Sequence, residues 1–451
     1  MKSSENITHI YARAGFGLRY DEFRQKQKWT VKKAVDALFD AHSISPFSFR
    51  LNVEDQQADR KTRMRMRREE ERRLNLAWMR YMAETNDVLR EKMVLFWHNH
   101  FACRTNRPEY ALQLNTIHRE HALGSFREML FAVSRSPAML AFLNNQQNRK
   151  GHPNENFARE VMELFTLGQG NYTEQDVKEA ARAFTGWSFD QNGDFQLRKR
   201  EHDDGQKIFL GEKGIFGGED ILDRLLARRQ CAVYICRKLY RSFVNEVPDE
   251  KNIGEMASVF FDSGYDIARV MRHMFTADWF YRPENRGNLI KSPVEMLVGL
   301  NRQFRIHYQN PAILLRFQRV LGQQLFNPPN VAGWPGGRNW IDSSTLLYRM
   351  QMPSLLLNNG EMNVAAKTDP EDEALIAQGQ RVNDRRARNV LAGADWNDVI
   401  GMIPKGMDNQ DLIPCFLQRD PPEATRREIQ AQSDRRLALL QMVSTPEYQL
   451  C

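Results

Sequence analysis

The stretch Leu89-Arg-Glu-Lys-Met-Val-Leu-Phe-Trp-His-Asn-His-Phe101 decides the fold class, because its apolar residues recur at the spacing of an α-helix. Side chains at i, i+4, i+7, i+8 and i+11 form one stripe along a helix. In this stretch the stripe consists of Leu89, Met93, Phe96, Trp97 and His100. We therefore predict a helix whose C-terminal end enters the core.

The same pattern continues through most of the chain, so the predicted fold class is mainly α. Two helix starts are marked by capping residues: Thr173 stands three residues before Asp176, and Ser292 directly precedes Pro293. A hydrophobic fraction of 41% with 27% charged residues is typical of a folded globular chain. Further helices are predicted in residues 112–121, 126–134, 137–144, 154–168, 173–184, 221–244, 253–263, 266–275 and 293–304.

Two segments interrupt the helical pattern. Residues 188–211 alternate around Asn192-Gly193, which predicts a small β-hairpin insertion with a primed turn. Residues 322–341 contain three prolines and four glycines, so we predict a structured loop without regular backbone. We expect Phe326, Trp334 and Trp340 to anchor this loop as a hydrophobic plug, although tryptophans in a loop also stack on sugar rings.

Composition divides the chain into three parts. Residues 1–360 form the predicted main helical domain, with a basic helical arm near 55–75. Residues 361–380 are acidic and small, which indicates a linker. Residues 381–451 return to a helical pattern, and we expect this C-terminal segment to pack on the main domain.

The predicted helical arm near residues 55–75 holds most of the formal net charge of +7. The run from Arg60 to Arg73 has eight basic and three acidic residues, a net charge of +5. We interpret it as a solvated helix, with a patch for phosphate or acidic lipid as the alternative. Because the run has no aromatic residue that could stack on a base, a nucleic-acid partner is not expected.

Cysteine usage and hydropathy exclude several protein classes. The five cysteines contain no CxxC pair, which argues against a disulfide scaffold and a structural zinc site. No apolar run approaches the roughly 18 to 20 residues that a membrane span needs. The start of the sequence has no recognisable signal peptide, so we expect a cytoplasmic protein unless an export signal has been removed.

Candidate metal ligands lie at the ends of two predicted helices. His100 lies on the apolar stripe and His98 on the opposite side of that helix. His100 has two interpretations: a buried ring bonded to a backbone carbonyl or carboxylate, or a ligand of a divalent metal together with His98 and Glu160. Glu160 borders the core beside Arg159, while Glu163 is expected to point away from it.

His202 and Asp203 are the candidate catalytic pair. Both follow the predicted hairpin, and loops carry functional residues disproportionately. Asp203 could orient His202 as a general base, or complete the metal site of His100 and Glu160. An Asx turn that stabilises the bend is an equally supported alternative.

Six motifs together carry a family resemblance. They are Arg13-Ala-Gly-Phe-Gly17, Trp97-His-Asn-His-Phe101, Pro153-Asn-Glu-Asn-Phe-Ala-Arg-Glu160, Met162-Glu-Leu-Phe-Thr-Leu-Gly168, Ala183-Phe-Thr-Gly-Trp187 and Pro328-Pro-Asn-Val-Ala-Gly-Trp-Pro-Gly-Gly337. The chain resembles the bacterial family of domain of unknown function 1800 from about His9 to Leu450. The resemblance implies a large helical domain, often encoded beside a sulfatase-like partner, and no established reaction.

Two functions follow as hypotheses. The first is a binding and assembly protein that acts with the sulfatase-like partner, since the motifs are rich in residues that specify packing and turns. The alternative is a metal-dependent enzyme of unknown reaction that uses the His, Glu and Asp residues above. No GxSxG or HExxH motif supports a serine hydrolase or a zincin.

Overall fold

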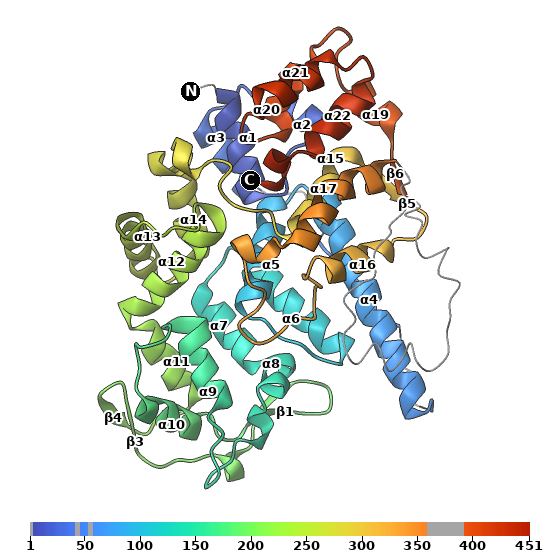
Figure 1. Cartoon of the computed structure of the whole chain (residues 1–451). Helices are drawn as coiled ribbons and strands as arrows, with labels where there is room; N and C mark the ends of the chain where they lie inside the picture. Colours follow the sequence, from blue (N-terminus) through green and yellow to red (C-terminus); the bar gives the residue numbers. More distant parts are fainter. Residues whose placement is uncertain (1–2, 41–45, 53–56, 359–391) are drawn as a thin grey trace.

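Helix α5 (Val88–His100) runs through the middle of the protein (Figure 1), in a computed structural model that describes residues 3–40, 46–52, 57–358 and 392–451. Its buried side chains lie on both faces of the helix, so the stripe seen in the sequence is only part of the buried surface. Its neighbours are α1 (Ser3–Ala14), α3 (Val31–Phe39), α4 (Arg60–Glu84) and α6 (Pro108–His121).

Helices dominate the described residues, as predicted. The other α-helices are α2 (Tyr20–Lys26), α7 (Phe126–Arg135), α8 (Pro137–Phe142), α9 (Asn156–Glu160), α10 (Glu174–Ala183), α11 (Gly218–Leu226), α12 (Arg229–Phe243), α13 (Glu250–Asp262), α14 (Ile267–Thr276), α15 (Pro293–Phe304), α16 (Ile313–Val320), α17 (Ser343–Leu357), α19 (Trp396–Gly401), α20 (Ile413–Phe416), α21 (Glu423–Ala431) and α22 (Arg435–Val443). The short helical segments are η1 (Asn145–Gln147), η2 (Val161–Thr166), η3 (Lys199–Glu201), η4 (Asp278–Tyr281), η5 (Pro283–Asn285), η6 (Gly337–Trp340), η7 (Asn409–Leu412) and η8 (Pro446–Gln449).

Local capping explains several helix starts. Thr173 and Asp176 form the predicted capping box at α10, and Ser292 caps α15 with Pro293 in its first turn. The prediction of one helix over 221–244 was wrong, because α11 ends at Leu226 and α12 begins at Arg229. The carbonyl of Leu226 is left free by this break and accepts a hydrogen bond from the Tyr265 hydroxyl at 2.6 Å.

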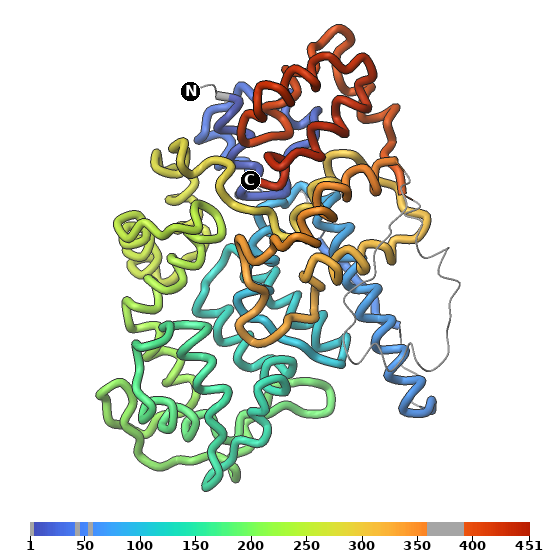
Figure 2. Tube along the Cα trace, viewed as in Figure 1, coloured from blue at the N-terminus to red at the C-terminus, as the bar shows by residue number. Residues whose placement is uncertain are grey.

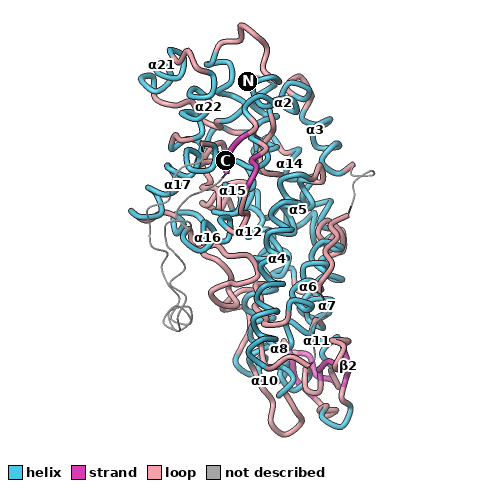
Figure 3. Tube along the Cα trace, turned by 90° about the vertical axis from the view of Figure 1, so that its right-hand side faces the viewer, coloured by secondary structure: helices cyan, strands magenta, loops and turns pink. Residues whose placement is uncertain are grey.

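The beginning and the end of the described chain meet in one region. Helices α1 to α3 and α19 to α22 lie together at the top of Figures 1 and 2, and the view in Figure 3 shows a narrower profile. α20 contacts α1, and α22 contacts α17. Strand β5 (Ile306–Tyr308) pairs antiparallel with β6 (Ala392–Ala394) and joins the C-terminal segment to the body. The predicted acidic linker, residues 361–380, lies outside the described residues.

Two hairpins occupy the predicted β region. β1 (Trp187–Phe189) pairs with β2 (Phe195–Leu197), and β3 (Lys207–Phe209) pairs with β4 (Glu212–Gly214), both antiparallel. The predicted primed turn was wrong, since only Gly193 of the Asn192-Gly193 pair has a positive φ. Asp190 explains the wider loop, because its carboxylate accepts from the N–H groups of Asn192 and Asp194 at 2.8 and 3.0 Å.

The loop of residues 322–341 has the predicted irregular backbone, interrupted only by η6. Phe326, Trp334 and Trp340 are 3%, 4% and 6% exposed, so the three side chains that we expected to anchor the loop are all buried. Within the described part of the chain, no helix combines the length and apolar character that crossing a membrane requires.

Candidate functional site

The C-terminal end of α5 binds two distant segments through three consecutive side chains. His98 accepts a hydrogen bond through Nε2 from the backbone N–H of Phe326 at 3.0 Å. Asn99 accepts through Oδ1 from the N–H of Trp334 at 2.7 Å. His100 contacts the carbonyl of Phe165 through Nε2 at 3.2 Å. This motif therefore ties the 322–341 loop and the η2 segment to the central helix.

The prediction that His98 lies opposite the core was wrong. Its side chain is 3% exposed because the 322–341 loop covers the face of α5 that the spacing assigns to solvent. The rings of Trp78, Phe326 and Trp334 lie 5.1 to 5.4 Å, centre to centre, from the imidazole. Burial lowers the pKa of His98 to about 3, so the ring is neutral and its Nε2 lone pair is used by Phe326.

His100 has both ring nitrogens occupied. Nε2 donates to the carbonyl of Phe165, and Nδ1 accepts from Lys238 Nζ at 3.0 Å. Burial and the charge of Lys238 hold the pKa of His100 well below its usual range, while burial lowers the pKa of Lys238 to about 8. The interpretation of His100 as a buried ring bonded to a backbone carbonyl is confirmed. Its role as a metal ligand stays a prediction.

The carbonyl that binds His100 is free because Phe165 lies in the last turn of the π-helix η2, where carbonyls have no donor within the helix. A π turn closes hydrogen bonds five residues apart, as in the bond from the Leu167 N–H to the Met162 carbonyl at 2.8 Å. Leu164 O accepts from Tyr234 Oη at 3.1 Å and from Lys238 Nζ at 3.3 Å. The side chains of His100, Tyr234 and Lys238 thus donate hydrogen bonds to the free carbonyls of Leu164 and Phe165.

The π turn also changes the surroundings of the two glutamates. Glu163, predicted to point away from the core, is half-buried and accepts a hydrogen bond from Tyr172 Oη. The pitch of 3.6 residues per turn that supported the prediction does not hold across η2. Burial and the charge of Glu163 raise the pKa of Glu160, whose carboxylate has no hydrogen-bond or ion-pair partner among the described residues. Arg159 binds Glu155 and Glu174 instead.

His202 and Asp203 have different partners. The Asp203 carboxylate accepts from Arg182 Nε at 2.8 Å and from the N–H of Gly205 at 2.8 Å. The second bond is the Asx turn that the sequence offered as an alternative. His202 contacts the carbonyl of Thr185 through Nδ1 at 2.8 Å. Asp203 thus directs its carboxylate to Arg182. The general-base pair of His202 and Asp203 stays a prediction.

The predicted metal ligands do not form one set. In the ranges that the structure describes, no three His, Cys, Asp or Glu side chains come together as a group that could hold a metal ion. The imidazoles of His98 and His118 have ring centres 6.3 Å apart. Both nitrogens of His118 are buried without a hydrogen bond.

The N-terminal part of α4 projects beyond the body of the protein (Figure 1). None of residues 60–69, named here the basic arm, is buried, and burial in α4 begins at Glu70. The basic arm contains six basic residues and one acidic residue. Arg60, Arg65 and Arg68 are exposed and make no hydrogen bond or ion pair through their side chains with the described residues. A groove of about 230 Å³ lies beside it, between Met66 and Pro108.

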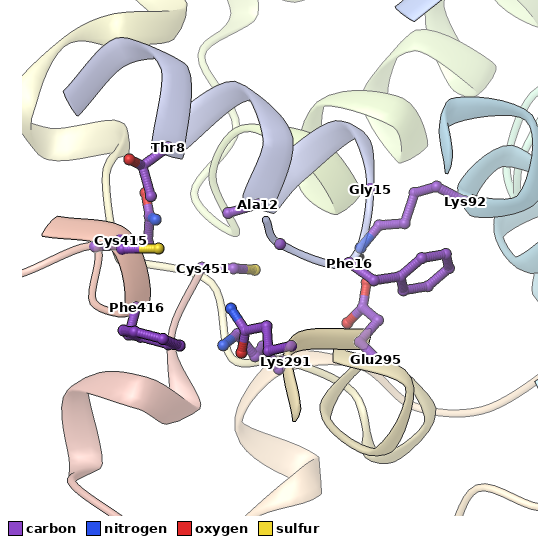
Figure 4. A pocket seen from close by; sticks show the side chains of 13 residues that line it. Thr8, Ala12, Gly15, Phe16, Lys92, Lys291, Glu295, Cys415, Phe416 and Cys451 are labelled. Atoms are coloured by element: carbon purple, nitrogen blue, oxygen red, sulfur yellow. Dashed lines mark hydrogen bonds and ion pairs between the residues drawn. The ribbon is translucent and has the colours of Figure 1, made fainter. Parts of the chain in front are cut away.

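A cavity with several charged residues lies between the two ends of the chain, and sequence reasoning missed it. Figure 4 shows Lys92 of α5 reaching toward Glu295 of α15 on one side, with Thr8, Cys415 and Phe416 on the other. The lining also includes Gly15, Phe16, Lys291 and Cys451. The sequence contained two indirect signals, the Arg13–Gly17 motif and the cap that follows Lys291.

Comparison with known proteins identifies the family of this chain. Neither the curated proteins nor the solved structures include a match to this chain. One family model, described as a protein of unknown function (DUF1800), matches residues 9–450 and so covers nearly the whole chain. The matched range contains all six motifs from the sequence, including the α5 end and the 322–341 loop. The chain belongs to the DUF1800 family of proteins of unknown function.

Proposed function

We propose that this protein is a binding component of a protein assembly and that its basic arm contacts an acidic surface of the partner. The exposure of the basic arm is the observation that carries this proposal. A helix that packs only within its own domain buries an apolar stripe, whereas residues 60–69 have no buried side chain. The two methionines of this segment, Met64 and Met66, supply apolar area between the arginines.

Charge complementarity favours an acidic protein surface as the occupant. The net charge of the basic arm is +5, and the exposed guanidinium groups of Arg60, Arg65 and Arg68 can bind carboxylates in bidentate fashion. The arm has no aromatic side chain on which a nucleic-acid base could stack. The sulfatase-like protein suggested by the family resemblance is the proposed partner.

The alternative of a metal-dependent enzyme has less support. Zinc sites in proteins use three or four side-chain ligands around one ion. His98 and His100 use their Nε2 atoms in hydrogen bonds to separate segments, and the described residues bring no three donor side chains together. The motif residues at the α5 end instead connect the core to the 322–341 loop.

A binding measurement with charge-reversed variants tests the proposal. Arg60, Arg65 and Arg68 are replaced together by glutamate, and affinity for the purified sulfatase-like protein is measured by biolayer interferometry at two salt concentrations. We expect a loss on the order of tenfold or more, and a weaker dependence on salt, since exposed charges act through screened electrostatics.

A matched control separates the basic arm from overall charge. The exposed residues Arg241, Lys251 and Arg269 lie on α12, α13 and α14, and changing them to glutamate alters the net charge by the same amount. Equal losses in the two triple variants, or no binding by the unaltered protein, would contradict the proposal. Retention on DNA that only the arm variant loses would replace the protein partner with a nucleic acid.

A further inference from the structure

The cavity between α1, α15 and the C-terminal segment has an unbalanced positive charge. Arg13, Lys92, Lys291 and Arg349 lie in or directly behind its wall, and Glu295 is the single carboxylate among the side chains that line it. Glu295 forms an ion pair with Lys92. Among the described residues, Arg13, Lys291 and Arg349 form no ion pair with a carboxylate side chain, although the charge at Cys451 favours the protonated forms of Arg13 and Lys291. An α-carboxylate at Cys451 would still leave two of them unbalanced.

The cations behind the wall are deeply buried. Arg13 is 1% exposed; one of its terminal nitrogens donates to the carbonyl of Asn285 at 2.8 Å, while its Nε and its other terminal nitrogen have no hydrogen bond. Arg349 is fully buried, donates to the carbonyl of the cavity residue Lys291, and also has one unpaired nitrogen. Buried charges without a partner are strongly unfavourable, so such a cluster is stable only with a counter-ion or at a functional site.

Lys291 and Gln418 present free polar groups to the cavity. The Lys291 ammonium group makes no hydrogen bond with the described residues and lies 3.8 Å from the centre of the Tyr448 ring. The amide of Gln418 is half-buried, lines the cavity, and likewise has no described hydrogen-bond partner. Lys291 also directly precedes the N-cap of α15, where the helix dipole adds positive potential. Donors and positive charge thus converge from several elements.

We propose that this cavity is an anion-binding site that takes one small anionic group, a carboxylate or an inorganic anion, held by Lys291 and Gln418. The free volume is about 20 Å³, which admits one water-sized group. A larger ligand would therefore insert only its anionic end. The bound anion would add to the counter-charge that Cys451 and Glu295 supply to Arg13, Lys291 and Arg349, and Glu295 with Lys92 closes one side of the site.

The burial of Lys291 is consistent with this assignment. Desolvation lowers its pKa to about 8, and the positive charges of Arg349 and Lys92 act in the same direction. The charge at Cys451 and the carboxylate of Glu295 act in the opposite direction, and Lys92 holds the pKa of Glu295 below its usual range. An anion in contact with Lys291 stabilises the protonated amine, so anion binding and protonation of Lys291 favour each other.

Thermal unfolding with added anions tests the site in the full-length protein. Acetate, phosphate and chloride are titrated separately at constant ionic strength, and saturable increases in the melting temperature are confirmed by calorimetry. We expect at least one anion to give a saturable increase. A response to acetate alone identifies a carboxylate ligand, whereas a response to phosphate or chloride identifies an inorganic ion.

Two variants locate the binding to the cavity. Lys291→Met is expected to weaken the apparent affinity on the order of tenfold or more, because a charge-assisted hydrogen bond is lost. Lys238→Met is the matched control, since Lys238 is another buried lysine with a lowered pKa outside this cavity. If Lys291→Met does not fold, Gln418→Ala is used and is expected to weaken binding as well. No saturable response in the unaltered protein, or unchanged affinity in the cavity variants, would overturn the proposal.

Discussion

Replacing Lys238 with methionine should remove a rise in stability that the unaltered protein shows at alkaline pH. Lys238 donates to His100 Nδ1 and to the Leu164 carbonyl of the π-helix. Burial lowers its pKa from 10.5 in the unfolded chain to about 8 in the folded protein. Between these two values the unfolded chain binds more protons, so the free energy of unfolding increases as pH rises.

The magnitude follows from the two pKa values. From pH 7 to pH 10 the proton linkage of Lys238 contributes about 2.5 kcal/mol to the stability of the unaltered protein. The methionine variant lacks this contribution. At pH 7 it also loses a buried charge that destabilises the fold by about 3 kcal/mol, and it leaves His100 Nδ1 unpaired at a cost of about 1–3 kcal/mol. These two effects nearly cancel, so the variant should match the unaltered protein at pH 7 and be less stable at pH 10.

Urea unfolding followed by tryptophan fluorescence at pH 7, 8, 9 and 10 measures this difference. The exposed Lys28→Met is the control variant, because Lys28 lies on the surface. Other groups titrate equally in both proteins and cancel in the comparison. A stability difference between the Lys238→Met variant and the unaltered protein that stays constant from pH 7 to pH 10 would refute the charged, buried state of Lys238.

Two further substitutions test the contacts around α5. Gly333 has a φ of +84°, and a Cβ there would lie 2.3 Å from Asn99 Oδ1. Gly333→Ala should therefore lower the free energy of unfolding by more than about 2 kcal/mol and shift the tryptophan emission. Gly336→Ala, with open space around the added Cβ, should do neither. Thermal melts with fluorescence detection compare the two. Glu91 is fully buried and accepts from Trp78 Nε1 at 2.8 Å and from Arg119 Nε at 2.7 Å. Glu91→Gln should therefore lower stability by about 3–5 kcal/mol in urea unfolding, against less than about 1 kcal/mol for the surface-paired Glu109→Gln. Equal effects in either pair of variants would contradict these contacts.

The candidate site was only partly predictable because spacing identifies faces of a regular helix and nothing else. His100 was placed correctly on the buried stripe, and its bond to a carbonyl was one of the two interpretations. His98 was misplaced because the loop that covers it lies more than two hundred residues further along the chain. Glu163 was expected to point away from the core, and it is half-buried with a hydrogen bond from Tyr172 Oη. The Asx turn at Asp203 was anticipated as an alternative because it depends on neighbours in sequence.

The sequence by itself determined the features that depend on local interactions. Apolar spacing predicted the helices, Ser292 and Thr173 predicted their starts, and the prolines and glycines of residues 322–341 predicted an irregular loop. The tertiary structure alone decided which charges meet. Arg13, Lys92, Lys291 and Arg349 come from four distant segments, and each looks ordinary in its own surroundings. Long-range packing removes them from water together, and desolvation then makes their unbalanced charge significant.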